Sequence, residues 1–140
     1  EITTSADLFG LTTEAKDDMG IGQVLEKALP HFDFIAPMIY PSHFYPGTAG
    51  YQNPAANPGP IITFSMKKGV EIAYEVASST GMSTSTLIAK YRPWYQDFDM
   101  GAKYTKEMVR AQIDAGDELG IHSWMLWDPA NKYTPAALKP

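Results

Sequence analysis

Cysteine is absent from this chain of 140 residues. Disulfide bonds and thiolate metal sites are therefore excluded, and nothing in the sequence fixes the redox state of its compartment. The three histidines, His31, His43 and His122, do not have the H-x-x-x-H spacing of a zinc site. We therefore expect neither a metal ion nor a cofactor.

Long apolar runs, blocks of like charge and glycine-rich phosphate loops are also absent. No segment approaches the roughly 18 consecutive apolar residues that span a bilayer, so we expect no membrane span. The net charge of −5 and the pI near 5.0 argue against nucleic acid or an anionic membrane surface as a partner. Neither G-x-G-x-x-G nor G-x-x-x-x-G-K follows a predicted strand, which disfavours a nucleotide ligand.

The residues that are present are typical of a folded protein. Hydrophobic residues make up 44% of the chain, and they include eight Tyr, six Phe and three Trp. This length suffices for one cored domain and no linker divides it, so we expect a single domain over residues 1–140. Eleven Pro and eleven Gly predict long, shaped loops between the regular elements.

Four segments predict strands, at residues 1–11, 32–40, 87–92 and 121–127. The first begins as a short strand with Asp7 at its downstream end and finishes in a turn marked by Gly10. The second segment is almost continuously apolar, which is typical of a parallel strand buried on both faces. Pro37 interrupts this segment. Because proline has no N–H to donate, it fits a strand there only at a bulge or a barrel opening.

Three segments between these strands carry the apolar spacing of a helix. The first covers residues 21–29, and the second covers residues 61–79 and stops at Gly81. The third begins at Thr105, a suitable N-cap, and ends at Gly120. The order β-α-β-α-β-α-β, in steps of about 30 residues, fits strand–helix–strand crossovers. The fold class is therefore α/β, with parallel β-strands joined by crossover helices.

Polar and aromatic side chains gather near the predicted strand ends, close to residues 7, 40, 92 and 127. Because the carboxyl ends of parallel strands share one edge, we expect these side chains to form one site. Aromatic rings can cover the C–H face of a pyranose, while Arg, Gln and Asp side chains hydrogen-bond its hydroxyl groups. The substrate-binding candidates are Tyr40, His43, Arg92, Trp94, Gln96, Trp127 and Asp128.

Several of these residues also have a purely structural interpretation. Trp94 and Trp127 could be core residues instead of a sugar platform, and Trp124 is the better core candidate. His43 could simply be exposed in its proline-rich loop, and Gln96 could only bridge loops. The sequence leaves both interpretations open.

Four motifs, in order along the chain, go beyond these patterns. They are SADLFG at 5–10, IAPMIYPSHF at 35–44, RPWYQDF at 92–98 and WMLWDP at 124–129. Together they resemble the glycoside hydrolase family of (β/α)8 barrels known as DUF4015, over nearly the whole chain. The resemblance implies a carbohydrate substrate, a bacterial source and an extracytoplasmic or cell-surface location.

The resemblance also implies that the chain is the C-terminal half of a TIM barrel, strands five to eight. A complete barrel takes about 250 residues and at least roughly 200, so a chain of 140 cannot close one. We expect either a missing N-terminal half or a second copy of the chain, in a homo-oligomer, to supply the other strands. An open half-barrel would expose two sheet edges and its inner face, which predicts association.

Cleavage of a glycosidic bond generally uses two carboxyl groups that flank it. Asp7 and Asp97 are the catalytic candidates, since both lie near predicted strand ends. The structural alternatives are a loop cap for Asp7, and an Asx turn or a salt bridge to Arg92 for Asp97. Asp128 precedes Pro129 and either contacts substrate or starts a turn. Many barrels of this kind carry an essential acid on strand four, which a half with strands five to eight lacks.

Three functions therefore stay open. The first is a glycoside hydrolase-like domain that acts on or binds a polysaccharide at the C-terminal ends of the strands. The second is a non-catalytic carbohydrate-binding barrel fragment. The third is a half-barrel module for assembly or interaction, whose sheet edge is an interface.

Overall fold

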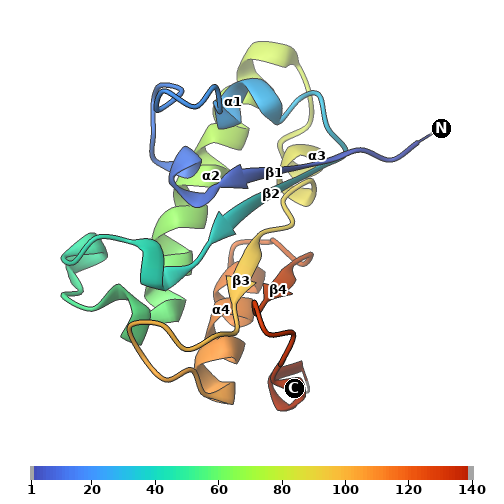
Figure 1. Cartoon of the computed structure of the whole chain (residues 1–140). Helices are drawn as coiled ribbons and strands as arrows, with labels where there is room; N and C mark the ends of the chain where they lie inside the picture. The colour runs from blue at the N-terminus through green and yellow to red at the C-terminus, as the bar shows by residue number, and fades with distance from the viewer. Residues whose placement is uncertain (1, 139–140) are drawn as a thin grey trace.

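The computed structural model describes residues 2–138 and contains a four-stranded parallel sheet with helices packed against it (Figure 1). The strands are β1 (Ser5–Phe9), β2 (Phe34–Ile39), β3 (Trp94–Gln96) and β4 (Met125–Trp127). They lie side by side in chain order, and every neighbouring pair is parallel. The predicted α/β class with a parallel sheet is confirmed.

Within residues 2–138, four α-helices connect the strands: α1 (Leu25–Ala28), α2 (Pro58–Thr80), α3 (Thr84–Ala89) and α4 (Lys106–Glu118). Helix α1 lies between β1 and β2 in the chain, α2 and α3 between β2 and β3, and α4 between β3 and β4. Each connection therefore includes at least one helical turn, as a crossover between parallel strands requires.

One face of the sheet forms the core with the helices. Successive side chains of a strand point to opposite faces, and Leu8, Ile35, Ile39 and Tyr95 point to the helix-covered face. Burying an apolar side chain of this size contributes about 1.5–3 kcal/mol, so these contacts hold the helices on the sheet. The helices contribute buried residues to the same cluster, among them Leu25, Ile61, Ile62, Met66, Leu87 and Ile113.

A gap in the sheet accommodates Pro37 inside β2. On the β3 side, Ile35 forms an isolated bridge with Tyr91, and regular pairing resumes only at Met38. The N–H of Ile35 donates toward that side, so the nitrogen of Pro37, two residues further on, faces the same side. The missing N–H therefore falls in the gap and costs the sheet no hydrogen bond.

The predicted strand at residues 87–92 is wrong. Residues Thr84–Ala89 form α3, and Leu87 is fully buried in the core against α2. Periodicity alone does not show whether a short apolar run of this kind is a strand or a helix, and here tertiary burial selects the helix. Strand β3 begins only after Pro93.

The predicted helix at residues 21–29 is a single turn, Leu25–Ala28. Gly20 and Gly22 adopt φ values of 70° and 74°, in the left-handed region that a right-handed helix excludes. The backbone therefore turns twice before it becomes helical.

Two predicted strands are also shorter in the structure. The segment 121–127 pairs as a strand only over Met125–Trp127, and the first strand is Ser5–Phe9. Asp7 therefore lies inside β1 and not at its downstream end. This shift places its side chain on a face of the sheet.

The ends of the two long helices agree with the sequence. Gly81 follows α2 with a φ of 74°, the left-handed conformation that glycine adopts without strain. The side chain of Thr105 accepts a hydrogen bond from the N–H of Met108 at 3.4 Å and caps α4. No helix among residues 2–138 is long and apolar enough to cross a membrane.

Candidate functional site

The face of the sheet opposite the helices carries a mixed set of acidic and aromatic side chains. We call it the open face and define it by Asp7, Phe9, Met38, Trp94 and Trp127. Strand register places them together, because Phe9 pairs with Met38 and Met38 pairs with Trp94. Phe9 and Trp127 remain 54% and 41% exposed, which is unusual for large apolar side chains on a sheet.

Asp7 is exposed in the middle of β1, an edge strand of the sheet, and its carboxylate accepts a hydrogen bond from Trp94. The indole Nε1 of Trp94 lies 3.1 Å from Oδ1 of Asp7, across the intervening strand β2. The residue beside Asp7 in the register is Ala36, whose small side chain leaves room for the indole to reach over it. Asp7 thus has one carboxylate oxygen held by the indole, while its side chain as a whole stays exposed.

The two tryptophans of the open face contact each other. The rings of Trp94 and Trp127 have centroids 6.0 Å apart and planes at 86°, an edge-to-face arrangement. Their strands are neighbours, and Trp127 pairs with Gln96, two residues beyond Trp94. Trp94 is the first residue of β3 and Trp127 is the last residue of β4, so the two rings form one aromatic patch across both strands.

A second aromatic group lies where β2 ends. Tyr40 packs against His43 with ring centroids 5.4 Å apart, and against Phe98 at 5.6 Å. Burial, together with the negative charge of Asp7 and a smaller effect of Tyr133, raises the pKa of Tyr40 to about 12. Tyr40 is therefore a neutral hydrogen-bond donor at ordinary pH.

Asp97 is nearly buried, and both of its carboxylate oxygens are occupied. One accepts the backbone N–H of Thr134 and the other accepts its hydroxyl, both at 2.7 Å. The structure does not show the alternative salt bridge between Asp97 and Arg92. Asp97 instead fixes the segment after β4 against the end of β3.

Gln96 and Asp128 also use their polar groups within the protein. Gln96 is fully buried, accepts the N–H of Ser42 at 3.1 Å and donates to the carbonyl of Phe98 at 2.9 Å. Asp128 is buried and accepts the N–H groups of Ala130 and Lys132, as a turn-forming aspartate does. Both residues organise loops at the carboxyl edge of the sheet.

Arg92 lies away from that edge. Its Nε donates to the hydroxyl of Ser123 at 2.8 Å, and its guanidinium lies 3.5 Å from the ring centroid of Phe34. Phe34 is the first residue of β2, so Arg92 is at the amino end of the sheet. The structure does not bring it together with Tyr40, His43 or Asp97.

The structure thus gathers only part of the predicted set on the open face: Asp7, Trp94 and Trp127, with Tyr40 and His43 beyond the end of β2. Phe9, Met38 and Thr134 were missed. The alternation of Ser5, Asp7 and Phe9 with Ala6 and Leu8 could have assigned Phe9 to the face of Asp7. Nothing local in the sequence links Thr134 to Asp97.

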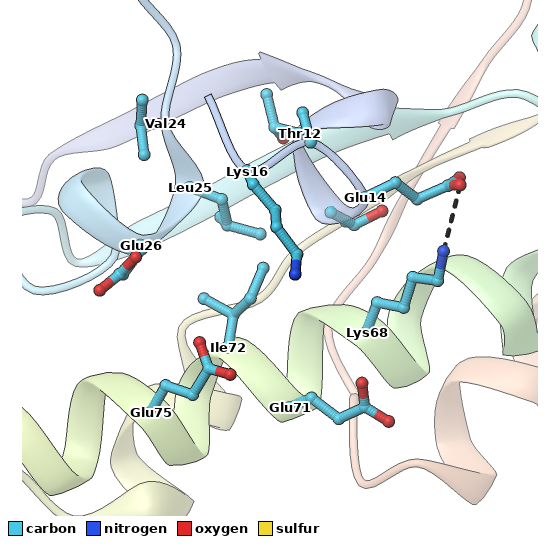
Figure 2. Close-up of a pocket in the computed structure, with 12 residues that line it drawn as sticks. Thr12, Glu14, Lys16, Val24, Leu25, Glu26, Lys68, Glu71, Ile72 and Glu75 are labelled. Atoms are coloured by element: carbon cyan, nitrogen blue, oxygen red, sulfur yellow. Dashed lines mark hydrogen bonds and ion pairs between the residues drawn. The ribbon is translucent and has the colours of Figure 1, made fainter. Parts of the chain in front are cut away.

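A separate hollow of about 430 Å³ lies on the helix-covered side (Figure 2). It is bounded by the turn after β1 (Gly10–Thr13), by α1 and by α2. Glu14 and Lys68 form an ion pair of 3.2 Å at its rim. None of the predicted site residues lines it. Among residues 2–138, no three His, Asp or Glu side chains are placed to hold a metal ion.

Fold and site together define an α/β protein whose parallel sheet presents a carboxylate and aromatic rings on one open face. The chain belongs to the DUF4015 family, described as "Putative glycosyl hydrolase domain", whose model matches residues 1–133. The resemblance drawn from the four sequence motifs is confirmed. Neither the curated proteins nor the solved structures contain a match to the chain.

Proposed function

We propose that the chain is the C-terminal half of a (β/α)8 barrel, strands five to eight, and that it acts on a polysaccharide as part of a glycoside hydrolase. The observation that carries this proposal is the open face, where an exposed carboxylate is held beside two tryptophans. In a closed barrel this face lines the interior, and its carboxyl end is where barrel enzymes place their sites.

The open face also supports barrel closure by other strands. Phe9 and Trp127 expose apolar surface on this face, and covering that surface would be favourable. The chain, one half-barrel unit over residues 1–140, would be completed by an N-terminal half or by a second copy. A complete set of eight strands would remove both sheet edges.

Asp7 is the carboxylate to which we assign the chemistry in this proposal. Its free oxygen can act as acid, base or nucleophile toward a sugar that rests on Trp94 and Trp127. Asp97, the other catalytic candidate, would first have to release both hydrogen bonds to Thr134. The second carboxyl group that hydrolysis requires is then supplied by the strands that complete the barrel.

A second function, carbohydrate binding without cleavage, is favoured by the hydrogen bonds that occupy Asp97. With Asp97 occupied by Thr134, the open face offers one free carboxylate, whereas hydrolysis generally needs two. Trp94 and Trp127 would still bind a sugar through their rings, and Tyr40 and His43 would contact the rest of the ligand.

The experiment is a panel of polysaccharides tested for cleavage and binding with the completed barrel, that is, the chain together with the strands that close it, as wild type and as Asp7→Asn. Loss of turnover in Asp7→Asn, with binding kept, supports a hydrolase. Asp114→Asn is the matched control, because Asp114 is an exposed carboxylate on α4, paired with Arg110. Binding without turnover in the wild type selects the carbohydrate-binding function. A protein that stays monomeric in light scattering, and neither binds nor cleaves, contradicts both functions.

A further inference from the structure

A hollow of about 280 Å³ lies at the carboxyl ends of β1 and β2, where Phe9 and Met38 of the open face form part of its wall. It is slightly smaller than pockets that hold a whole drug-sized ligand, which begin at about 300 Å³, so it suits one ring of a larger molecule. Its side-chain lining consists of Phe9, Leu11, Met38, Tyr40, His43 and Phe44.

The backbone that frames this hollow is fixed by Gly10. A methyl group at position 10 would collide with the carbonyl oxygen of Met38, so only glycine lets the turn after β1 approach β2 this closely. The close approach holds Phe9 and Leu11 beside Met38 and Tyr40. The walls of the hollow are therefore set by the sheet and by the first turn beyond it.

The chemistry of the lining selects an aromatic occupant. Four of its six side chains are rings, and rings pack favourably on other rings in offset or edge-to-face arrangements. Only Tyr40 and His43 carry polar side-chain atoms, too few to satisfy the several hydroxyl groups of a pyranose. A planar ring with a single oxygen substituent meets both conditions.

The position of the hollow connects it to the proposed sugar platform. Phe9 lies two residues beyond Asp7 on the same face of β1, a distance of about 7 Å along the strand. Met38, on the neighbouring strand, pairs with Trp94, whose indole also contacts Asp7. A molecule with a ring in the hollow and a sugar over the two tryptophans would pass directly over the Asp7 region.

We infer that this hollow is a subsite for an aromatic group joined to the sugar, so that the ligand class is an aryl-substituted carbohydrate. This inference rests on the proposed carbohydrate function of the open face and specifies its ligand. The ring is buried among Phe9, Met38 and Phe44, and its oxygen faces Tyr40 or His43.

The test compares 4-nitrophenyl glycosides with methyl glycosides of the same sugars, by calorimetric titration of the protein. The expected result is binding of at least one 4-nitrophenyl glycoside about tenfold or more tighter than its methyl counterpart. Phe9→Ala removes one wall and should abolish this preference, and because Phe9 is 54% exposed the variant should still fold. Tyr45→Ala is the control, since Tyr45 is 75% exposed and does not line the hollow.

Equal affinity for the two glycosides, binding of neither, or an unchanged preference in Phe9→Ala would overturn the subsite. The proposed function fails differently. Polysaccharide turnover without an aryl preference removes the subsite and keeps the hydrolase, whereas an aryl preference without turnover keeps the subsite and removes the hydrolase.

Discussion

The two faces of the sheet differ although the same four strands build both. On the helix-covered face, Leu8, Ile35, Ile39 and Tyr95 are buried and pack against helices. On the open face, one residue away along the same strands, Phe9 stays exposed. A strand alternates its side chains between faces, so one segment can supply a core and a binding surface at once. The covered face provides stability, and the open face is the one on which we propose the chemistry.

The sharpest test of this difference uses two adjacent residues of β1. Leu8→Ala should lower the free energy of unfolding by about 2–5 kcal/mol, because it leaves a cavity in the core. In the chain without the strands that complete the barrel, Phe9→Ala removes a larger but exposed side chain and should lower it by less than about 1 kcal/mol. Denaturant unfolding of both variants measures the two values. Similar losses would mean that the open face is packed in solution.

A second test concerns close packing on the covered face between α4 and β3. A methyl group at Gly116 would collide with the buried hydroxyl of Tyr95, so Gly116→Ala should destabilise by about 1–3 kcal/mol. That hydroxyl has no hydrogen-bond partner among residues 2–138, so Tyr95→Phe removes the obstacle at little cost. Thermal unfolding of the double variant should recover most of the loss. If the double variant recovers no stability, the strain in Gly116→Ala does not come from the hydroxyl of Tyr95.

The two candidate acids separate stability from activity. Asp97→Ala leaves the N–H and hydroxyl of Thr134 without their acceptor and should cost about 1–3 kcal/mol of stability. Asp7→Ala should change stability by less than about 0.5 kcal/mol, because Asp7 is exposed. Denaturant unfolding measures both, and a larger loss for Asp7 than for Asp97 would reverse this assignment.

The smallest expected effect is a pH dependence at the amino end of the sheet. The backbone N–H of Thr4 and then its hydroxyl donate to Asp33, which lowers the pKa of this exposed carboxylate below its ordinary 3.8. Because the pKa of Asp33 is lower in the folded state, the ionised carboxylate stabilises the fold above pH 3.8. This contribution is lost as the pH falls through the folded-state pKa. The stability gap between wild type and Asp33→Asn should therefore be constant near neutral pH and shrink below about pH 4. A gap that grows on acidification would contradict the assignment.

Much of the fold was predictable because its signals are local. The apolar run of β2 and the capped ends of α2 and α4 were identified close to their observed bounds. The segment at 87–92 was not identified correctly, because a short apolar run has no strong preference for strand or helix. Here the burial of Leu87 in the core selects the helix. The site was predictable only in part for the same reason. The bond between Asp7 and Trp94 joins residues 87 positions apart and depends on strand register.

The sequence by itself determined the α/β class, the parallel sheet and membership of the DUF4015 family, because periodicity, helix caps and motifs are properties of neighbouring residues. Only the tertiary structure decided which carboxylate stays free. Asp7 and Asp97 look alike in the sequence, yet Asp97 is bound by Thr134 and Asp7 is exposed beside Trp94. That distinction arises from long-range packing. The order and register of the strands, and not the neighbours in the chain, decide which partner a side chain meets.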